Sequence, residues 1–133
     1  MPAFVDTDVF GYLLSTGAKE KVARRIAEER HCTSVQVLNE FIAVCRKSGL
    51  DRATAYQLSD TLASVCVVSD ISIATYRVAQ ALAMRYQLSH WDGLIVAAAT
   101  IANCETLYSE DLQHGQAYGT VQVANPFKAL GKA

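Results

Sequence analysis

The sequence lacks an excess of either charge: 12 lysines and arginines nearly balance 13 aspartates and glutamates, which leaves a net charge of −1. A general basic coat for polyanions is therefore not expected, and any contact with nucleic acid must use a local patch. The chain also lacks an apolar run that could span a bilayer, because its most apolar stretch, 93–102, is about half the ~20 residues required. Residues 1–6 include a carboxylate where a signal peptide needs its apolar region, so we expect a cytoplasmic protein without a membrane segment.

Several motifs of well-known catalytic and metal sites are also absent. No C-x-x-C pair occurs, and the three histidines do not lie at zinc-ligand spacing from the cysteines. A glycine-rich phosphate loop, an H-E-x-x-H motif and a G-x-S-x-G motif are missing as well. The cysteines all lie among apolar residues, which predicts reduced thiols buried in the core: Cys32, Cys45, Cys66 and Cys104.

The pattern of apolar segments predicts one α/β domain over residues 1–133. The chain is 51% apolar and long enough for one core, and it shows no repeat, linker or low-complexity segment. Helical patterns alternate with short apolar runs, which favours a three-layer α/β/α domain with a mostly parallel sheet of four or five short strands. The predicted strands are 3–5, 31–33, 65–68, 105–109 and 121–124, and the strand at 65–68 is expected to be fully buried.

The most informative stretch is 88–103, which predicts a helix buried in the core. Ser89 is a suitable N-cap, and Asp92 falls at the third helical position, which forms a capping-box pattern. The alanines that follow allow neighbouring elements to approach closely. Asp92 then lies at the positive end of the helix dipole, at the rim of the core. Two interpretations remain open here: Asp92 only caps the helix, or it belongs to a functional site.

Further carboxylates are predicted to lie at the same rim. Asp6 and Asp111 each follow a predicted strand, and ligands of such sheets bind at the carboxyl edge of the strands. Glu40 lies more than one turn into its helix, so its placement depends on the tilt of that helix. Carboxylates gathered in one cleft repel each other unless a hard cation such as Mg²⁺ or Mn²⁺ neutralises them. Metal-assisted phosphodiester hydrolysis uses such a cluster, whereas the alternative is a set of surface carboxylates with no common site.

The chain contains FVDTDV at 4–9, VLNEF at 37–41, WDGLIVAAA at 91–99 and LYSEDLQHG at 107–115, followed by NPF at 125–127. These motifs, in this order and across essentially the whole chain, resemble the PIN-domain family, with the spacing of the VapC-type toxins of bacterial toxin–antitoxin pairs. The resemblance implies an endoribonuclease that depends on Mg²⁺ or Mn²⁺. By position, the residues that match the family's acidic cluster are Asp6, Glu40, Asp92 and Asp111, and Ser109 matches its usual hydroxyl.

Two positions depart from the family pattern without removing a ligand. Asp8 replaces the usual Asn and could add a charge near the metal, whereas Gly93 replaces the usual Ala, a mild change at a helix start. The resemblance also implies an RNA substrate, an antitoxin whose C-terminal segment covers the acidic cleft, and a homodimer. The alternative from another class is a non-catalytic PIN-like module that binds RNA or protein.

Other residues and families receive weaker support from the sequence. Trp91 could stack on an RNA base, although packing at the start of the helix is the commoner role. His114 is more consistent with a hydrogen bond that orders its loop than with a phosphate contact. A phosphatase of the haloacid-dehalogenase type also has an Asp-x-Asp after its first strand. It needs a downstream lysine, but no lysine lies between Lys47 and Lys128.

Overall fold

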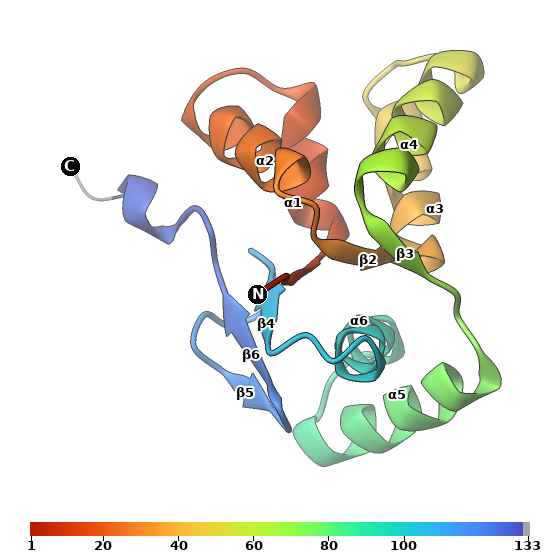
Figure 1. Ribbon diagram of the computed structural model, residues 1–133, viewed down its shortest axis with the longest axis vertical. Helices are drawn as coiled ribbons and strands as arrows, with labels where there is room; N and C mark the ends of the chain where they lie inside the picture. The colour runs from red at the N-terminus through yellow and green to blue at the C-terminus, as the bar shows by residue number, and fades with distance from the viewer. Residues whose placement is uncertain (132–133) are drawn as a thin grey trace.

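The computed structural model describes residues 1–131, in which a mainly parallel sheet lies between two layers of helices (Figure 1). The predicted domain, 1–133, ends on residues 132–133, which lie outside this described part. The strands are β1 (Phe4–Val5), β2 (Cys32–Ser34), β3 (Val67–Ser69), β4 (Thr106–Tyr108), β5 (Ala117–Tyr118) and β6 (Val121–Ala124). The helices are α1 (Thr7–Gly11), α2 (Ala18–Glu28), α3 (Val35–Lys47), α4 (Arg52–Val65), α5 (Ile73–Tyr86) and α6 (His90–Ile101), with 3₁₀ turns η1 (Tyr12–Leu14) and η2 (Lys128–Gly131).

The sheet places the two strands that carry predicted site residues side by side. Its order is β3-β2-β1-β4-β6-β5, and every pair is parallel except β5 with β6. Phe4 aligns with Cys32 on one side and with Leu107 on the other, so β1 lies in the middle of the sheet. The backbone N–H of Asp6 then donates to the carbonyl of Tyr108 at 3.0 Å, which brings the carboxyl ends of β1 and β4 together.

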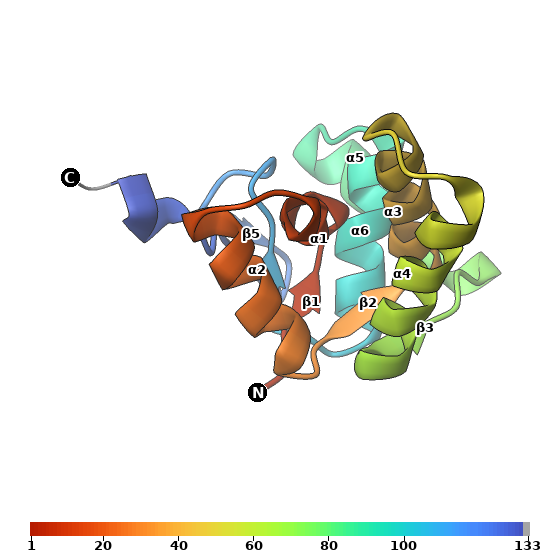
Figure 2. The same cartoon turned by 90° about the horizontal axis from the view of Figure 1, so that it is seen from above.

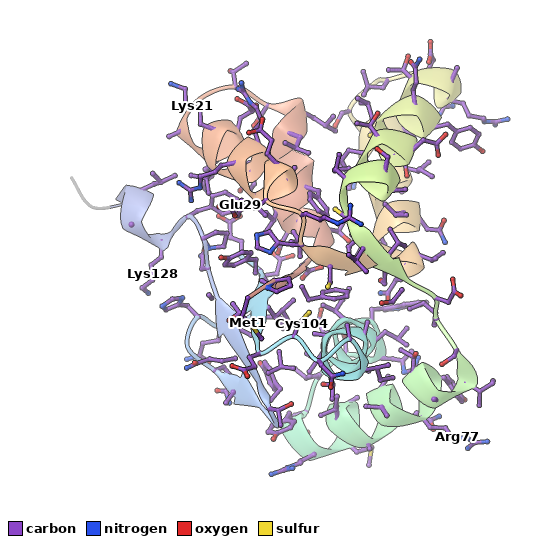
Figure 3. The ribbon with its side chains drawn as sticks, viewed as in Figure 1. Met1, Lys21, Glu29, Arg77, Cys104 and Lys128 are labelled. Carbon is purple, nitrogen blue, oxygen red and sulfur yellow. The ribbon has the colours of Figure 1, made fainter. Side chains whose placement is uncertain are left out.

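Helices cover both faces of this sheet. Helices α1 to α4 lie on one face, whereas α6 packs across the other face with α5 outside it (Figure 1). Seen from above, α1 lies between α2 and the α3–α4 pair (Figure 2). Side chains on the outer surfaces include Lys21 and Arg77, whereas Cys104 lies inside, near α6 (Figure 3). No helix within residues 1–131 has both the length and the apolar character needed to cross a membrane.

The predicted three-layer α/β/α architecture is confirmed, but the strand count and one strand assignment are wrong. The described residues form six strands rather than four or five. The missed strand, β5, is two residues long and is joined to β6 by a tight turn at Gly119, which has a positive φ of 64°. The strand predicted at 65–68 begins only at Val67, because α4 continues to Val65. It is an edge strand that pairs only with β2, and Val67 is 47% exposed instead of buried.

The cysteine prediction is confirmed: all four thiols are buried, and none forms a disulfide within residues 1–131. Burial raises the pKa of Cys66 to about 11. Burial, together with contact with Cys32, raises the pKa of Cys104 to about 12. A thiol with such a pKa is protonated at neutral pH and is a poor nucleophile or metal ligand.

Helix α6 is the central helix of the fold, and Gly93 allows it to lie very close to α5. Every residue from Gly93 to Ala99 is buried. A Cβ added at Gly93 would lie 2.8 Å from the carbonyl oxygen of Ala79 and 3.3 Å from the Cβ of Ala83, both on α5. An alanine at position 93 would force the two helices apart. Gly93 is therefore not a mild departure from the family pattern in this chain.

We expect Gly93→Ala to destabilise the protein by about 1–2 kcal/mol, although alanine is the better helix former by about 1 kcal/mol. Gly11→Ala is the matched control, because a Cβ there would meet only Val44 Cγ1 at 3.8 Å and the backbone φ of −56° suits any residue. Urea unfolding of both variants measures the effect. A Gly93→Ala protein as stable as the Gly11→Ala protein would contradict the close approach of α5 and α6.

Candidate active site

A cavity of about 360 Å³ at the carboxyl edge of the sheet brings the predicted acidic residues together. It contains all four carboxylates of the predicted cluster and Asp8 as well. A second cavity of about 460 Å³ continues from it on the side of η1, and the two share Thr7, Asp8, Val44 and Asp111. The first cavity is lined by Asp6, Thr7, Asp8, Glu40, Ala43, Val44, Trp91, Asp92, Ile95 and Asp111.

Asp6 is the most deeply placed of these carboxylates. It ends β1 and caps α1, where its Oδ1 accepts a hydrogen bond from the backbone N–H of Thr7 at 2.7 Å. Its Oδ2 accepts from the hydroxyl of Ser109 at 3.0 Å, and only 8% of the residue is exposed. Burial, followed by the negative charge of Asp8, raises the pKa of Asp6 to about 7 in spite of these hydrogen bonds.

Asp8 fixes the turn that follows β4. Its Oδ2 accepts from the backbone N–H groups of Glu110 at 3.1 Å and of Asp111 at 2.8 Å, and it also lies 3.4 Å from the Ser109 hydroxyl. Its Oδ1 is buried and has no hydrogen-bond partner among residues 1–131. Burial raises the pKa of Asp8 to about 6, although the two backbone donors act in the opposite direction. Asp8 therefore joins α1 to the segment that carries Asp111.

Glu40 reaches the cavity from the second turn of α3. Its Oε1 accepts from the hydroxyl of Thr7 at 2.7 Å, and its Oε2 accepts from the amide of Gln36 at 3.4 Å. Thr7 and Gln36 therefore position this carboxylate, and neither was identified from the sequence. A signal for Gln36 was present, because residues four apart on a helix lie on the same face.

Asp92 lies at the predicted place, at the start of α6 and at the rim of the core. Its backbone N–H donates to the hydroxyl of Ser89 at 3.1 Å, so the N-cap is confirmed. The reciprocal half of the capping box is not formed, and no hydrogen bond reaches the Asp92 carboxylate in the described part of the chain. The half-buried Asp92 side chain therefore faces the cavity without a partner that would explain it as a simple cap.

Glu110 is separate from the cluster, although it is adjacent to Asp111. It forms an ion pair with Lys19 at 2.6 Å and accepts from the Tyr12 hydroxyl at 2.5 Å. His114 accepts a hydrogen bond from the backbone of Asn125 at 2.9 Å, which confirms its role in ordering the loop. Trp91 does not pack into the core but is 65% exposed.

The donor atoms of the cluster suit a hard divalent cation. All are carboxylate oxygens, and one is buried without a partner among the described residues. The raised pKa values of Asp6 and Asp8 come first from burial and then from the neighbouring carboxylates, and a bound cation would oppose both effects. The residues are not, however, arranged as a finished coordination site. Within residues 1–131, no three acidic, histidine or cysteine side chains are placed to share one ion.

The raised pKa of Asp6 predicts a pH-dependent stability of the metal-free protein. The unfolded chain loses this proton near the ordinary value of 3.8, whereas the folded protein keeps it to about 7. The free energy of unfolding therefore falls as the pH rises through this window, with a limiting slope of about 1.4 kcal/mol per pH unit for one proton. We expect Asp6→Asn to gain stability relative to the wild type between about pH 4 and pH 7.

Urea unfolding in the presence of a chelator, at a series of pH values, measures this difference. Asp60→Asn is the matched control, because Asp60 lies exposed on α4, and its difference from the wild type should not grow across the window. A pH profile of Asp6→Asn parallel to that of the wild type would show that the Asp6 carboxyl does not retain a proton.

The fold of this chain is similar to that of three solved toxin–antitoxin proteins. A toxin–antitoxin complex from Klebsiella pneumoniae is 20% identical, with a TM-score of 0.72 over 93% of this chain and 97% of that chain. VapBC2 from Rickettsia felis, bound to a DNA fragment from its promoter, is 18% identical, with a TM-score of 0.69 over 94% and 98%. VapC20 of Mycobacterium tuberculosis, a toxin that cleaves the sarcin–ricin loop, is 19% identical, with a TM-score of 0.66 over 82% and 89%.

The sequence comparisons assign the family. No curated protein matches the chain. The family profile of the PIN domain, however, matches residues 3–119, which include all the carboxylates that line the acidic cavity. The match covers most of the chain, and it agrees with the mainly parallel α/β fold and with the resemblance of the sequence motifs. The chain therefore belongs to the PIN domain family.

Proposed function

We propose that this protein is an endoribonuclease that depends on Mg²⁺ or Mn²⁺ and acts as the VapC-type toxin of a toxin–antitoxin pair. The observation that carries the proposal is the acidic cavity, in which the buried Asp6 and the half-buried Asp8 lie beside three further carboxylates. A fold gains nothing from such a cluster, because burial and mutual repulsion both destabilise it. Strain of this kind is typical of a functional site.

The residues of the cavity divide into two roles in this proposal. Asp6, Glu40, Asp92 and Asp111 would hold the cation, which supplies an activated water and charge stabilisation at the scissile phosphate. Ser109 orients Asp6 through its 3.0 Å hydrogen bond, and Thr7 orients Glu40. Asp8 holds the backbone of Asp111 in place. The groove formed by the two adjoining cavities gives an RNA strand room on both sides of the cluster.

The proposed partners follow from the family and from the similar structures. Two of those structures contain a toxin with its antitoxin. We propose that an antitoxin of this chain covers the acidic cleft with its C-terminal segment, and that the toxin forms a homodimer in the cytoplasm. An antitoxin that covers the cleft inhibits cleavage, because it excludes the RNA strand from the carboxylates.

The decisive experiment is cleavage of single-stranded RNA by the purified protein, freed of contaminating nucleases, with Mg²⁺ or Mn²⁺ and then with a chelator. Cleavage that the chelator abolishes supports the proposal. Binding of RNA without cleavage under every metal condition would instead support the alternative, a non-catalytic PIN-like module.

The substitution Asp92→Asn distinguishes between two roles of the Asp92 carboxylate, that of a metal ligand and that of a helix cap. If Asp92 only caps α6, the substitution costs about 0.3–1 kcal/mol of dipole interaction and leaves cleavage intact. We expect the opposite result: unchanged or higher stability without metal, a smaller rise in Tm on addition of Mn²⁺, and cleavage reduced by orders of magnitude. Asp60→Asn is again the control. An Asp92→Asn protein that cleaves normally and keeps its full Mn²⁺ shift would refute this role.

A further inference from the structure

A third cavity, of about 340 Å³, adjoins the acidic cavity on the side of α3 and α6. Trp91 and Glu40 belong to both cavities and therefore form the wall between them. A molecule with its charged group at the carboxylates could thus place a neighbouring group in the third cavity. The lining residues are Val35, Gln36, Asn39, Glu40, Ile71, Trp91 and Leu94.

Most of this third cavity presents an apolar surface to solvent. Trp91 is 65% exposed, whereas Val35 and Ile71 are 38% and 37% exposed. The Trp91 ring makes an edge contact with His90, whose ring in turn contacts Tyr76, each at 5.9 Å between centroids. A large, exposed aromatic side chain beside a polar cleft is typical of the platforms on which single-stranded nucleic acids stack their bases.

An incompletely bonded amide stands at the border of the same cavity. The Nε2 of Gln36 donates to Glu40 at 3.4 Å, which leaves its second N–H free for another acceptor. The Oε1 of Gln36 is buried and has no hydrogen-bond partner in the described chain. The second N–H of the Gln36 amide can donate to an acceptor on the edge of a nucleobase, whereas the buried Oε1 is closed to such a contact.

We propose that the third cavity is a nucleobase site, in which a base stacks on Trp91 and accepts a hydrogen bond from the free N–H of the Gln36 amide. The ligand class is a single-stranded RNA whose bases are unstacked. The phosphate next to that base then reaches the acidic cavity across the wall formed by Trp91. The inference rests on the proposed nuclease function for its substrate, and it adds the subsite that positions the strand.

The observations favour a base over a protein surface as the occupant. A protein interface would account for the exposed Trp91 and Ile71, but it would not require an aromatic platform that also lines the acidic cavity. The shared wall also connects this cavity directly with the carboxylates. A partner protein over Trp91 is therefore the competing outcome of the test.

Tryptophan fluorescence tests the proposal directly, because Trp91 is the only tryptophan of the chain. The probe is adenosine 5′-monophosphate in Mg²⁺, which has a base and a phosphate but no internucleotide bond to cleave. We expect saturable quenching of the Trp91 emission by this nucleotide and none by ribose 5-phosphate. Equal quenching by both compounds, or no quenching by either, would overturn the proposal.

A pair of glutamine variants tests the contact with the base edge. Gln36→Met keeps the length of the side chain but removes the amide, and we expect the nucleotide to bind at least about fivefold more weakly. Gln57→Met, at an exposed position of α4, is the matched control and should bind as the wild type does. The Trp91 fluorescence of the wild type could instead change with protein concentration and stay the same when the nucleotide is added. That result would identify this surface as a protein interface and would overturn the proposal.

The cleavage reaction provides a second measurement that distinguishes this inference from the nuclease function. Trp91→Ala should raise the KM for a short single-stranded RNA by roughly 5- to 100-fold while changing kcat less, and Trp91→Phe should restore much of the KM. A Trp91→Ala protein with the KM of the wild type would contradict the base site. Nucleotide binding without any RNA cleavage would refute the proposed function but leave the base site standing.

Discussion

The hydrogen bond from the Asp6 N–H to the Tyr108 carbonyl, at 3.0 Å, is the last rung of the β1–β4 ladder, and the geometry of the site depends on it. It brings together chain segments that are about 100 residues apart: Ser109 reaches Asp6, and the backbone of Asp111 reaches Asp8. Helix α6 crosses the opposite face of the sheet and contributes Asp92 from its first turn. Parallel pairing thus assembles at one edge the carboxylates that the sequence separates.

This arrangement opposes the stability of the fold that produces it. The buried Asp6 and the half-buried Asp8 lie close to each other, and residues 1–131 offer them backbone and hydroxyl donors but no cationic side chain. The nearby Lys19 is engaged by Glu110 and Tyr12, which keeps its charge away from the cluster. Burial of the apolar side chains of helix α6 and of the central strands stabilises the fold enough to offset this repulsion. The structure therefore combines a well-packed core with an electrostatically strained rim.

Sequence reasoning predicted the features that depend on local pattern. The N-cap at Ser89, the buried course of α6 and the positions of Asp6 and Asp111 after strands all follow from spacing and residue type. Features set by tertiary neighbours could not be predicted in this way. The exposure of Trp91, the edge position of Val67 and the Thr7–Glu40 hydrogen bond depend on which elements lie next to them. Strand β5 is too short to give a periodic signal.

The contact between Gly93 and the Ala79 carbonyl has a consequence for how such sequences can diverge. Because a methyl group at position 93 meets the backbone of α5, no change of side chain at position 79 can make room for it, and alanine at position 93 requires α5 to move away from α6. Helix α5 leads back to Ile71 and the apolar cavity beside Trp91. We therefore expect that a methyl group added at position 93, deep in the core, changes the shape of the surface cavity beside Trp91.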